Sequence, residues 1–161
     1  AALKYDNQPQ LARFLGVWMG QQWLASPMAQ MKQGRSLIVV PVPANAAKKK
    51  RRGYDQAELL AAAFCQYTRL PLDLRRVIRT TDTVPMFGLS LTERQQNVQG
   101  TFQLHPRFRP AADHARQSVL LLDDIYTTGS TMKAIAHLLR QHRMSVYGAI
   151  TLAKAGLSDA T

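Results

Sequence analysis

Two adjacent acidic residues followed by a hydroxyl-rich turn form the stretch of this sequence best suited to ligand chemistry. Asp123 and Asp124 come after an apolar run at residues 119–122, and Thr-Thr-Gly-Ser-Thr occupies residues 127–131. Carboxylates accept hydrogen bonds from vicinal hydroxyls. A small turn at a helix N-terminus offers an anion free N–H groups, hydroxyl donors and the positive end of the helix dipole. The two features together predict a ligand that carries vicinal hydroxyls close to a phosphate, such as a ribose 5-phosphate.

Two secondary-structure elements must position these residues. The apolar run at 119–122 is typical of a strand buried on both faces of a parallel sheet, and such sheets bind ligands where their strands end. Beyond the turn, apolar residues recur at helical spacing and predict a helix over residues 130–143. A simpler interpretation remains, in which an Asp-Asp turn ends the strand and a Ser/Thr cap begins the helix. The three parts in this order and at this spacing favour the binding interpretation.

A second strand–loop–helix unit precedes the first. The apolar run at residues 36–42 predicts a buried strand that ends at Pro41 and Pro43, and apolar residues from Leu59 to Tyr67 predict a helix. The loop between them has five cations at residues 48–52, followed by Gly53. It should face the same end of the sheet as the two acids, where its glycine and basic residues would suit a diphosphate. A solvated basic loop is the alternative for the lysines at 48–50.

The remaining pattern completes a single α/β domain over residues 1–161, with an N-terminal helical segment at 1–34 and a ligand-binding core at 35–153. A helix is predicted over residues 8–25 with a short helical piece up to residue 34, and strands over residues 72–79, 101–104 and 145–152. Strands that alternate with helices predict a parallel sheet flanked by helices and joined by right-handed crossovers. The polar stretch at 80–100 is long for a connection and predicts a flexible lid loop or a disordered segment.

Composition narrows the setting and the partners. The chain has 161 residues, of which 46% are hydrophobic, so one domain with a substantial core is expected. The single cysteine, Cys65, excludes a disulfide framework and a cysteine metal site. Without a signal peptide or an apolar run of membrane-spanning length, a reduced, cytoplasmic setting is expected. The net charge of +11 favours anionic partners, and both a phosphorylated small molecule and nucleic acid fit it.

Four apolar residues, two acids and Thr-Thr-Gly-Ser-Thr resemble the signature with which type I phosphoribosyltransferases bind phosphoribosyl pyrophosphate (PRPP). Two further blocks narrow this resemblance to the ComF competence-protein family over nearly the whole chain. One is Val-Pro-Val-Pro at 40–43 with Arg-Gly-Tyr-Asp-Gln at 52–56, and the other spans residues 89–102. Relatives are associated with natural transformation, the uptake of single-stranded DNA. The resemblance therefore implies PRPP as ligand, with single-stranded DNA and competence proteins as further partners.

The resemblance also implies a role for each part of the site. Asp123 and Asp124 would be the catalytic acids that hold the ribose hydroxyls. The 5-phosphate would be bound by Thr127, Thr128, Gly129, Ser130 and Thr131. The diphosphate would lie against Pro43, Arg52 and Gly53, with Mg²⁺ bound through the ligand and not directly by the protein. The lid would carry Glu93, Arg94 and Asn97. The candidates for contacts with single-stranded DNA are Lys48, Lys49, Lys50 and Arg51.

Four features depart from the family pattern. The family implies a cysteine-rich, zinc-binding module ahead of the core domain, whereas this chain starts at Ala1 and has one cysteine, so the module is either removed or absent from this branch. Tyr54 and Asp55 replace Phe and Asn, and Met86 replaces a Gln ahead of the lid block. Thr127 occupies the position of an acidic base in purine-salvage relatives. This last change weighs against hypoxanthine or guanine as acceptor.

The expected function is that of a PRPP-binding, phosphoribosyltransferase-like protein of the ComF type that acts in DNA uptake. The reaction implied by the resemblance is displacement of pyrophosphate from the anomeric carbon of the ribose. The rival is a non-catalytic ligand sensor or single-stranded-DNA-binding module that keeps the same fold. The net charge of +11, the basic run at 48–52 and the lack of an evident catalytic base support this rival.

Overall fold

The computed structural model describes residues 8–32, 34–46, 49–50, 53–80, 101–109 and 117–155. Its helices are α1 (Pro9–Ala25), α2 (Pro27–Gln30), α4 (Gln56–Thr68) and α6 (Ser130–Gln141). Its strands are β1 (Ser36–Pro41), β2 (Val77–Arg79), β3 (Phe102–Leu104), β4 (Gln117–Tyr126) and β5 (Ser145–Lys154). The predicted helices at 8–25 and 130–143 and the predicted strands at 36–42, 101–104 and 145–152 are confirmed to within two residues at each end.

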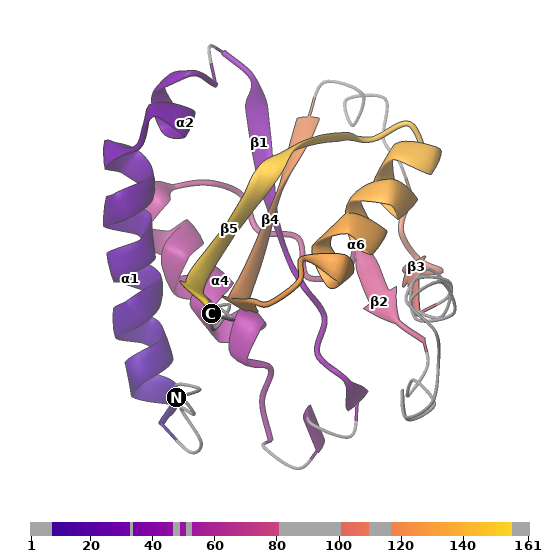
Figure 1. Cartoon of the computed structure of the whole chain (residues 1–161), viewed down its shortest axis with the longest axis horizontal. Helices are drawn as coiled ribbons and strands as arrows, with labels where there is room; N and C mark the ends of the chain where they lie inside the picture. Colours follow the sequence, from indigo (N-terminus) through magenta and orange to yellow (C-terminus); the bar gives the residue numbers. More distant parts are fainter. Residues whose placement is uncertain are drawn as a thin grey trace, which may run out of the picture.

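Three parallel strands form the central sheet, in the order β1-β4-β5 (Figure 1). β1 pairs with β4 until Pro41 lies opposite Leu122, and one further backbone hydrogen bond follows, from the N–H of Val42 to the carbonyl oxygen of Leu122 (2.8 Å). The next N–H on that side of the chain belongs to Ala44, and it donates instead to the carboxylate of Asp55 (2.9 Å). A side chain from the start of α4 therefore ends the ladder between β1 and β4.

β4 continues beyond the end of β1, because its other edge stays paired with β5. Asp123 lies opposite Thr151 of β5, and the ladder runs on to the last residue of both strands. The prediction that Asp123 and Asp124 follow the strand is therefore wrong: both lie inside β4. They nevertheless stand past the point where β1 separates, so the sheet is open beside them on that edge.

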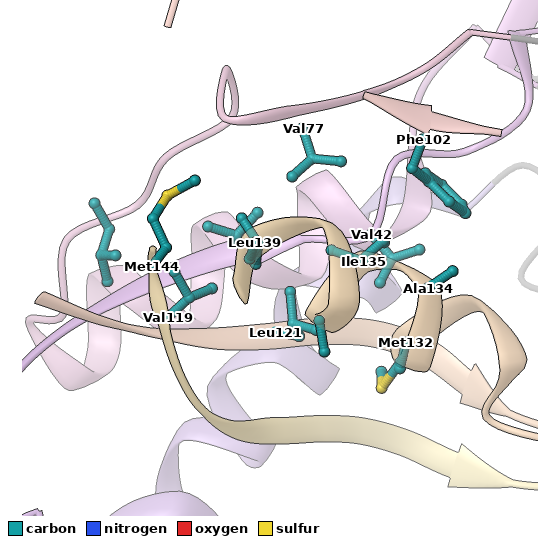
Figure 2. Packing of buried hydrophobic residues seen from close by; sticks show 13 residues of the cluster. Val42, Val77, Phe102, Val119, Leu121, Met132, Ala134, Ile135, Leu139 and Met144 are labelled. Carbon is teal, nitrogen blue, oxygen red and sulfur yellow. The ribbon is translucent and has the colours of Figure 1, made fainter. Parts of the chain in front are cut away.

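The two faces of the sheet carry separate hydrophobic clusters, because successive side chains of β4 point to opposite sides. Val119 and Leu121 belong to the cluster beneath α6, which Figure 2 shows with Leu139 lying over the sheet. Leu120 and Leu122 belong to the cluster with α1 and α4. These four side chains are each at most 1% exposed, as expected for the part of a strand that is buried on both faces.

The helices that follow β1 and β4 cover opposite faces of the sheet. β1 leads into α4, which packs with α1 on one face, whereas β4 leads into α6 on the other (Figure 1). In an open parallel sheet, such a reversal leaves a crevice outside the carboxyl ends of the two neighbouring strands, and ligands bind there. The topology therefore predicts a ligand-binding site at the end of β1 and the adjoining half of β4.

α1 packs closely against α4, with Met19 and Trp23 buried and Trp18 44% exposed. The helices approach each other tightly at Gly16, where a Cβ atom would lie 2.5 Å from the carbonyl oxygen of Leu60. A side chain at this position would force the helices apart. Because α1 and α4 share one hydrophobic cluster, α1 is part of the same packed unit as the central sheet.

The predicted strand at 72–79 forms only in part and does not join the parallel sheet. β2, at Val77–Arg79, pairs antiparallel with β3 in a separate two-stranded sheet. Asp73 explains the interruption, since its carboxylate accepts hydrogen bonds from the backbone N–H of Arg75 (2.9 Å) and from Nε of Arg76 (2.9 Å) and so stabilises a turn. Before this turn, Leu72 keeps one parallel bridge to β1.

Several predicted residues lie outside the described part of the chain: Lys48, Arg51, Arg52, Met86, Glu93, Arg94 and Asn97, together with the lid at 81–100. Among the helices that the structure describes, none has the length and apolar character needed to cross a membrane.

Candidate functional site

A pocket of about 170 Å³ lies at the carboxyl ends of β1 and β4. Its walls come from the loop after β1, the start of α4, the end of β2, the carboxyl half of β4 and the first turn of α6. The charged side chains that line it are three acids and two bases: Asp55, Asp123, Asp124, Lys49 and Arg79. A pocket with both acceptors and cations suits a ligand that carries hydroxyls and anionic groups together.

Asp123 and Asp124 both line the pocket, and they interact with each other. The backbone N–H of Asp124 donates to Oδ1 of Asp123 (2.8 Å). The pKa of Asp123 is raised from 3.8 to about 8, first by burial and then by the negative charge of Asp124 and a side-chain hydrogen bond with it. Asp123 is therefore mostly protonated at neutral pH. In that form its carboxyl group donates one hydrogen bond and still accepts others, which matches a pair of neighbouring hydroxyls.

The predicted phosphate loop leads directly into α6. Gly129 precedes the helix with φ +74°, a left-handed conformation that favours glycine. The ring of Tyr126 lies against it, since a Cβ at residue 129 would come 2.7 Å from two ring carbons. The hydroxyl of Thr128 accepts from the N–H of Ser130 (3.4 Å) and donates to its Oγ (3.0 Å). Thr131 lines the pocket, so the first turn of α6, where helices leave N–H groups without carbonyl partners, faces the two acids.

The remaining predicted site residues differ in how close they lie to the pocket. Thr127 and Thr128 are both exposed, and neither lines the pocket. Pro43 lines it, whereas Gly53 does not and donates its backbone N–H to the carbonyl oxygen of Lys49 (2.8 Å). Lys49, which was predicted as a DNA contact, also lines the pocket.

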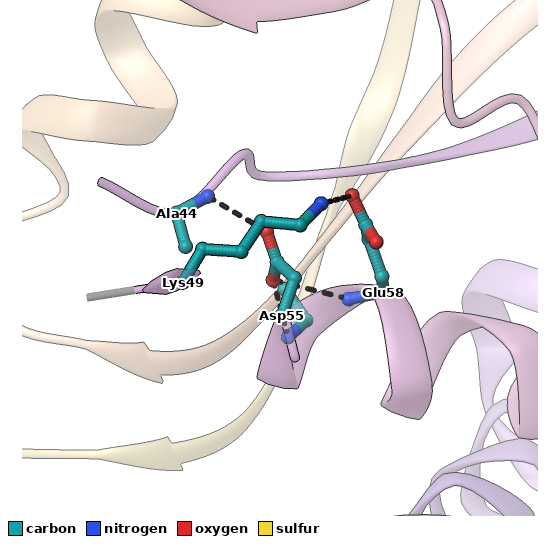
Figure 3. Close-up of polar contacts among 5 residues, drawn as sticks. Ala44, Lys49, Asp55 and Glu58 are labelled. Carbon is teal, nitrogen blue, oxygen red and sulfur yellow. Dashed lines mark hydrogen bonds and ion pairs between the residues drawn. The ribbon is translucent and has the colours of Figure 1, made fainter. Parts of the chain in front are cut away.

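Asp55, for which the sequence predicted no role, holds two walls of the pocket together. Its Oδ2 accepts from the N–H of Ala44 in the loop after β1 (2.9 Å), and its Oδ1 accepts from the N–H groups of Ala57 (3.0 Å) and Glu58 (3.3 Å) at the start of α4 (Figure 3). It is thus the N-cap of α4. Burial, the largest cause, raises its pKa. The sequence does contain a pattern that predicts this cap. Asp55 precedes Glu58 by three residues, ahead of an apolar run, and this spacing is typical of a capping box.

Arg79 is the second residue that the sequence analysis missed. It ends β2, lines the pocket, and places its guanidinium 5.5 Å from the centroid of the Phe102 ring. Its buried Nε has no hydrogen-bond partner within the described residues. The guanidinium can therefore bind an anionic ligand. No local pattern distinguishes Arg79 from Arg75 and Arg76, since its position depends on the pairing of β2 with β3.

Comparison with known proteins identifies the family of the chain. The family model described as "Phosphoribosyl transferase domain" matches residues 50–159, which include α4, β4, the phosphate loop and α6. The chain belongs to the phosphoribosyltransferase domain family. This match and the observed topology confirm the predicted fold class, a parallel sheet flanked by helices of the type I phosphoribosyltransferase kind.

Two curated relatives indicate the branch of the phosphoribosyltransferase family. The chain is 35% identical over 103 residues to competence protein F of Haemophilus influenzae, a match that covers 64% of this chain and 44% of that protein. It is 28% identical over 139 residues to the DNA utilization protein YhgH of Salmonella typhimurium, covering 85% of this chain and 57% of that protein. The predicted ComF recognition is confirmed by these relatives and the family match. The chain spans about half the length of the curated relatives that it matches.

Two solved phosphoribosyltransferases match most of the chain at low sequence identity. A hypoxanthine phosphoribosyltransferase from Staphylococcus aureus matches 94% of this chain and 66% of its own, with 17% identity and a TM-score of 0.47. A hypoxanthine phosphoribosyltransferase from Trypanosoma cruzi matches 100% of this chain and 75% of its own, with 11% identity and a TM-score of 0.48.

Proposed function

We propose that this protein binds PRPP or another ribose 5-phosphate and acts as a ComF-type, phosphoribosyltransferase-like protein in DNA uptake. The observation that carries the proposal is the convergence of two acids, the first turn of α6 and two cations on one pocket at the carboxyl ends of β1 and β4. Acceptors for hydroxyls, an anion-binding helix start and cations for a second anionic group are the three kinds of contact that PRPP requires.

Each part of the ligand has its own contacts in this proposal. The 5-phosphate lies at the start of α6, bound by the loop at 127–131. Asp123 and Asp124 hold the ribose hydroxyls. The diphosphate lies against Pro43 and Arg52, as the family resemblance implies. Arg79 is added as a further contact because it lines the pocket and carries a guanidinium that suits phosphate oxygens.

The chemistry that this arrangement supports is displacement of pyrophosphate from the anomeric carbon. The bond from that carbon to the diphosphate oxygen breaks, the electron pair leaves with pyrophosphate, and an acceptor forms the new bond. Positive charge grows on the ribose and negative charge on the leaving group, so the negative charge of Asp124 beside the ribose and the cations beside the diphosphate both act electrostatically. Thr127 supplies no acidic base, which argues for an acceptor other than hypoxanthine or guanine.

The residues of the pocket fit Mg²⁺ that arrives with the ligand. Among the described residues, no group of three or more His, Cys, Asp or Glu side chains is placed to hold a metal ion. Mg²⁺ is commonly bound through one or two carboxylates together with substrate phosphates, and Asp123 and Asp124 line the pocket that would receive the diphosphate. When bound, the ion neutralises charge that develops on the leaving diphosphate.

A non-catalytic module that binds single-stranded DNA is the second candidate, and the net charge of +11 favours it. Lys50 is exposed and does not line the pocket, so it remains a candidate DNA contact. Lys49 belongs to the pocket and supports this candidate less than the sequence suggested. The names of the relatives, competence protein F and DNA utilization protein YhgH, support the proposed role in DNA uptake for either candidate.

Calorimetric titration with inorganic phosphate, ribose 5-phosphate and PRPP, each with MgCl₂, tests the assignment. The double variant Asp123→Asn with Asp124→Asn should weaken the binding of ribose 5-phosphate and PRPP far more than the binding of phosphate, because only the ribose contacts change. Asp73→Asn removes an acid outside the pocket and serves as the control. Equal losses for phosphate and ribose 5-phosphate would contradict the ribose assignment. Pyrophosphate release with PRPP, Mg²⁺ and a panel of bases then separates an enzyme from a binding module.

A further inference from the structure

Lys49 lines the pocket, and its ammonium group is already bound by a carboxylate. Its Nζ is 2.8 Å from Oε1 of Glu58, and the two side chains are 48% and 32% exposed (Figure 3). Lys49 lines the pocket, whereas Glu58, in the first turn of α4, is not among the lining residues. The ion pair therefore links Glu58 to the pocket through Lys49.

The backbone of both residues is fixed by hydrogen bonds, so a change of partner requires only side-chain rotation. The N–H of Lys49 donates to the carbonyl oxygen of Asn45 (2.9 Å), and its carbonyl oxygen accepts from the N–H of Gly53 (2.8 Å). The N–H of Glu58 donates to Oδ1 of Asp55 (3.3 Å). A lysine side chain is a flexible four-carbon stem with a compact charge at its end. Its ammonium can turn from Glu58 towards a ligand while the backbone of Lys49 keeps its hydrogen bonds.

The charges of the pocket favour such an exchange when a strongly anionic group enters. Lys49 and Arg79 are the described cations that line it, and they face three acids. Glu58 engages one of these two cations. An ion pair as exposed as this one changes an equilibrium constant by no more than about fivefold. Charge-assisted hydrogen bonds to phosphate oxygens are among the strong polar contacts in proteins, so a diphosphate can displace the carboxylate.

We propose that Glu58 is a built-in competitor for the diphosphate of the ligand. It keeps Lys49 at the pocket in the absence of a diphosphate and releases it when the more highly charged group arrives. Glu58 is thus a positioning residue that acts through Lys49 and sets selectivity for a diphosphate. The inference rests on the proposed function, and it adds Glu58 as the residue that regulates access of the ligand to Lys49, one of the cations of the pocket.

The test uses the 161-residue chain, with inorganic pyrophosphate and ribose 5-phosphate as separate probes in the presence of MgCl₂. Lys49→Gln should weaken pyrophosphate binding by roughly tenfold or more, since a charge-assisted contact is lost. Glu58→Gln should strengthen it by roughly two- to fivefold, the worth of an exposed ion pair. Neither change should alter the affinity for ribose 5-phosphate. If Glu58 had a merely structural role, its substitution would change the affinities for both probes equally. Lys50→Gln removes the same charge from an exposed neighbour that does not line the pocket and is the matched control.

The double variant Lys49→Gln with Glu58→Gln decides whether Glu58 acts through Lys49. Its pyrophosphate affinity should equal that of Lys49→Gln alone, because the competitor has no cation left to hold. A gain from Glu58→Gln that persists without Lys49, a loss in place of a gain, or an equal effect of Lys50→Gln would overturn the inference. Each of these results leaves the proposed function intact if the wild-type protein binds both probes. A wild-type protein that binds neither would refute the proposed function itself.

Discussion

Asp123 should make the stability of the protein fall as pH rises from about 5 to 8. Its pKa is raised from 3.8 to about 8 in the folded protein, so the folded state keeps a proton that the unfolded chain releases above pH 4. One such proton lowers the free energy of unfolding by up to about 1.4 kcal/mol per pH unit. Asp123→Asn is close to the protonated side chain in shape and cannot ionise. Between pH 5 and 8 the wild-type protein should therefore lose about 4 kcal/mol relative to this variant.

Urea unfolding of both proteins at pH 5, 6, 7 and 8 measures this effect, because every other titrating group contributes to both curves. The difference in unfolding free energy between variant and wild type should grow steadily from pH 5 to pH 8. Asp124→Asn should flatten the wild-type dependence, since the charge of Asp124 is the second cause of the shift. A difference that stays constant over this range would refute the idea that burial and Asp124 keep Asp123 protonated.

Two further substitutions test the loops around the pocket. Gly129→Ala should abolish phosphate binding in calorimetry and lower stability by about 1–3 kcal/mol, because φ is +74° and a Cβ would collide with the ring of Tyr126; unchanged phosphate affinity would contradict the loop assignment. Asp55→Ala should cost about 2 kcal/mol in urea unfolding, since it removes the cap of α4 and leaves the N–H of Ala44 without its partner. Asp55→Asn keeps one acceptor oxygen and should cost about half as much, so equal costs would argue against two separate contacts.

The elements that build the site could be predicted from local patterns. The continuous apolar run at 119–122 indicated a doubly buried strand, and the apolar spacing after Thr131 indicated a helix, because both signals depend on burial within one element. The strand–acid–hydroxyl motif placed Asp123 and Thr131 together, and the pocket contains both. Parallel strands bring their carboxyl ends to one edge, which is why this part of the site follows from sequence.

Features that depend on contacts between distant elements did not follow from the sequence. The extra length of β4 comes from its pairing with β5, which no local pattern in β4 reveals. The antiparallel pair of β2 and β3, which carries Arg79 to the pocket, joins residues separated by the stretch at 81–100. Lys49 was predicted with its basic neighbours as one group, and only its ion pair with Glu58 and its place in the pocket distinguish it from Lys50.

A crystal structure of the protein with ribose 5-phosphate tests the central claim most directly. We expect the phosphate at residues 127–131, hydrogen-bonded to the first turn of α6, and the vicinal hydroxyls within hydrogen-bond distance of the carboxyl groups of Asp123 and Asp124. A phosphate bound beside Lys49 and Arg79 in place of the α6 loop, or a ribose directed away from the two acids, would contradict it.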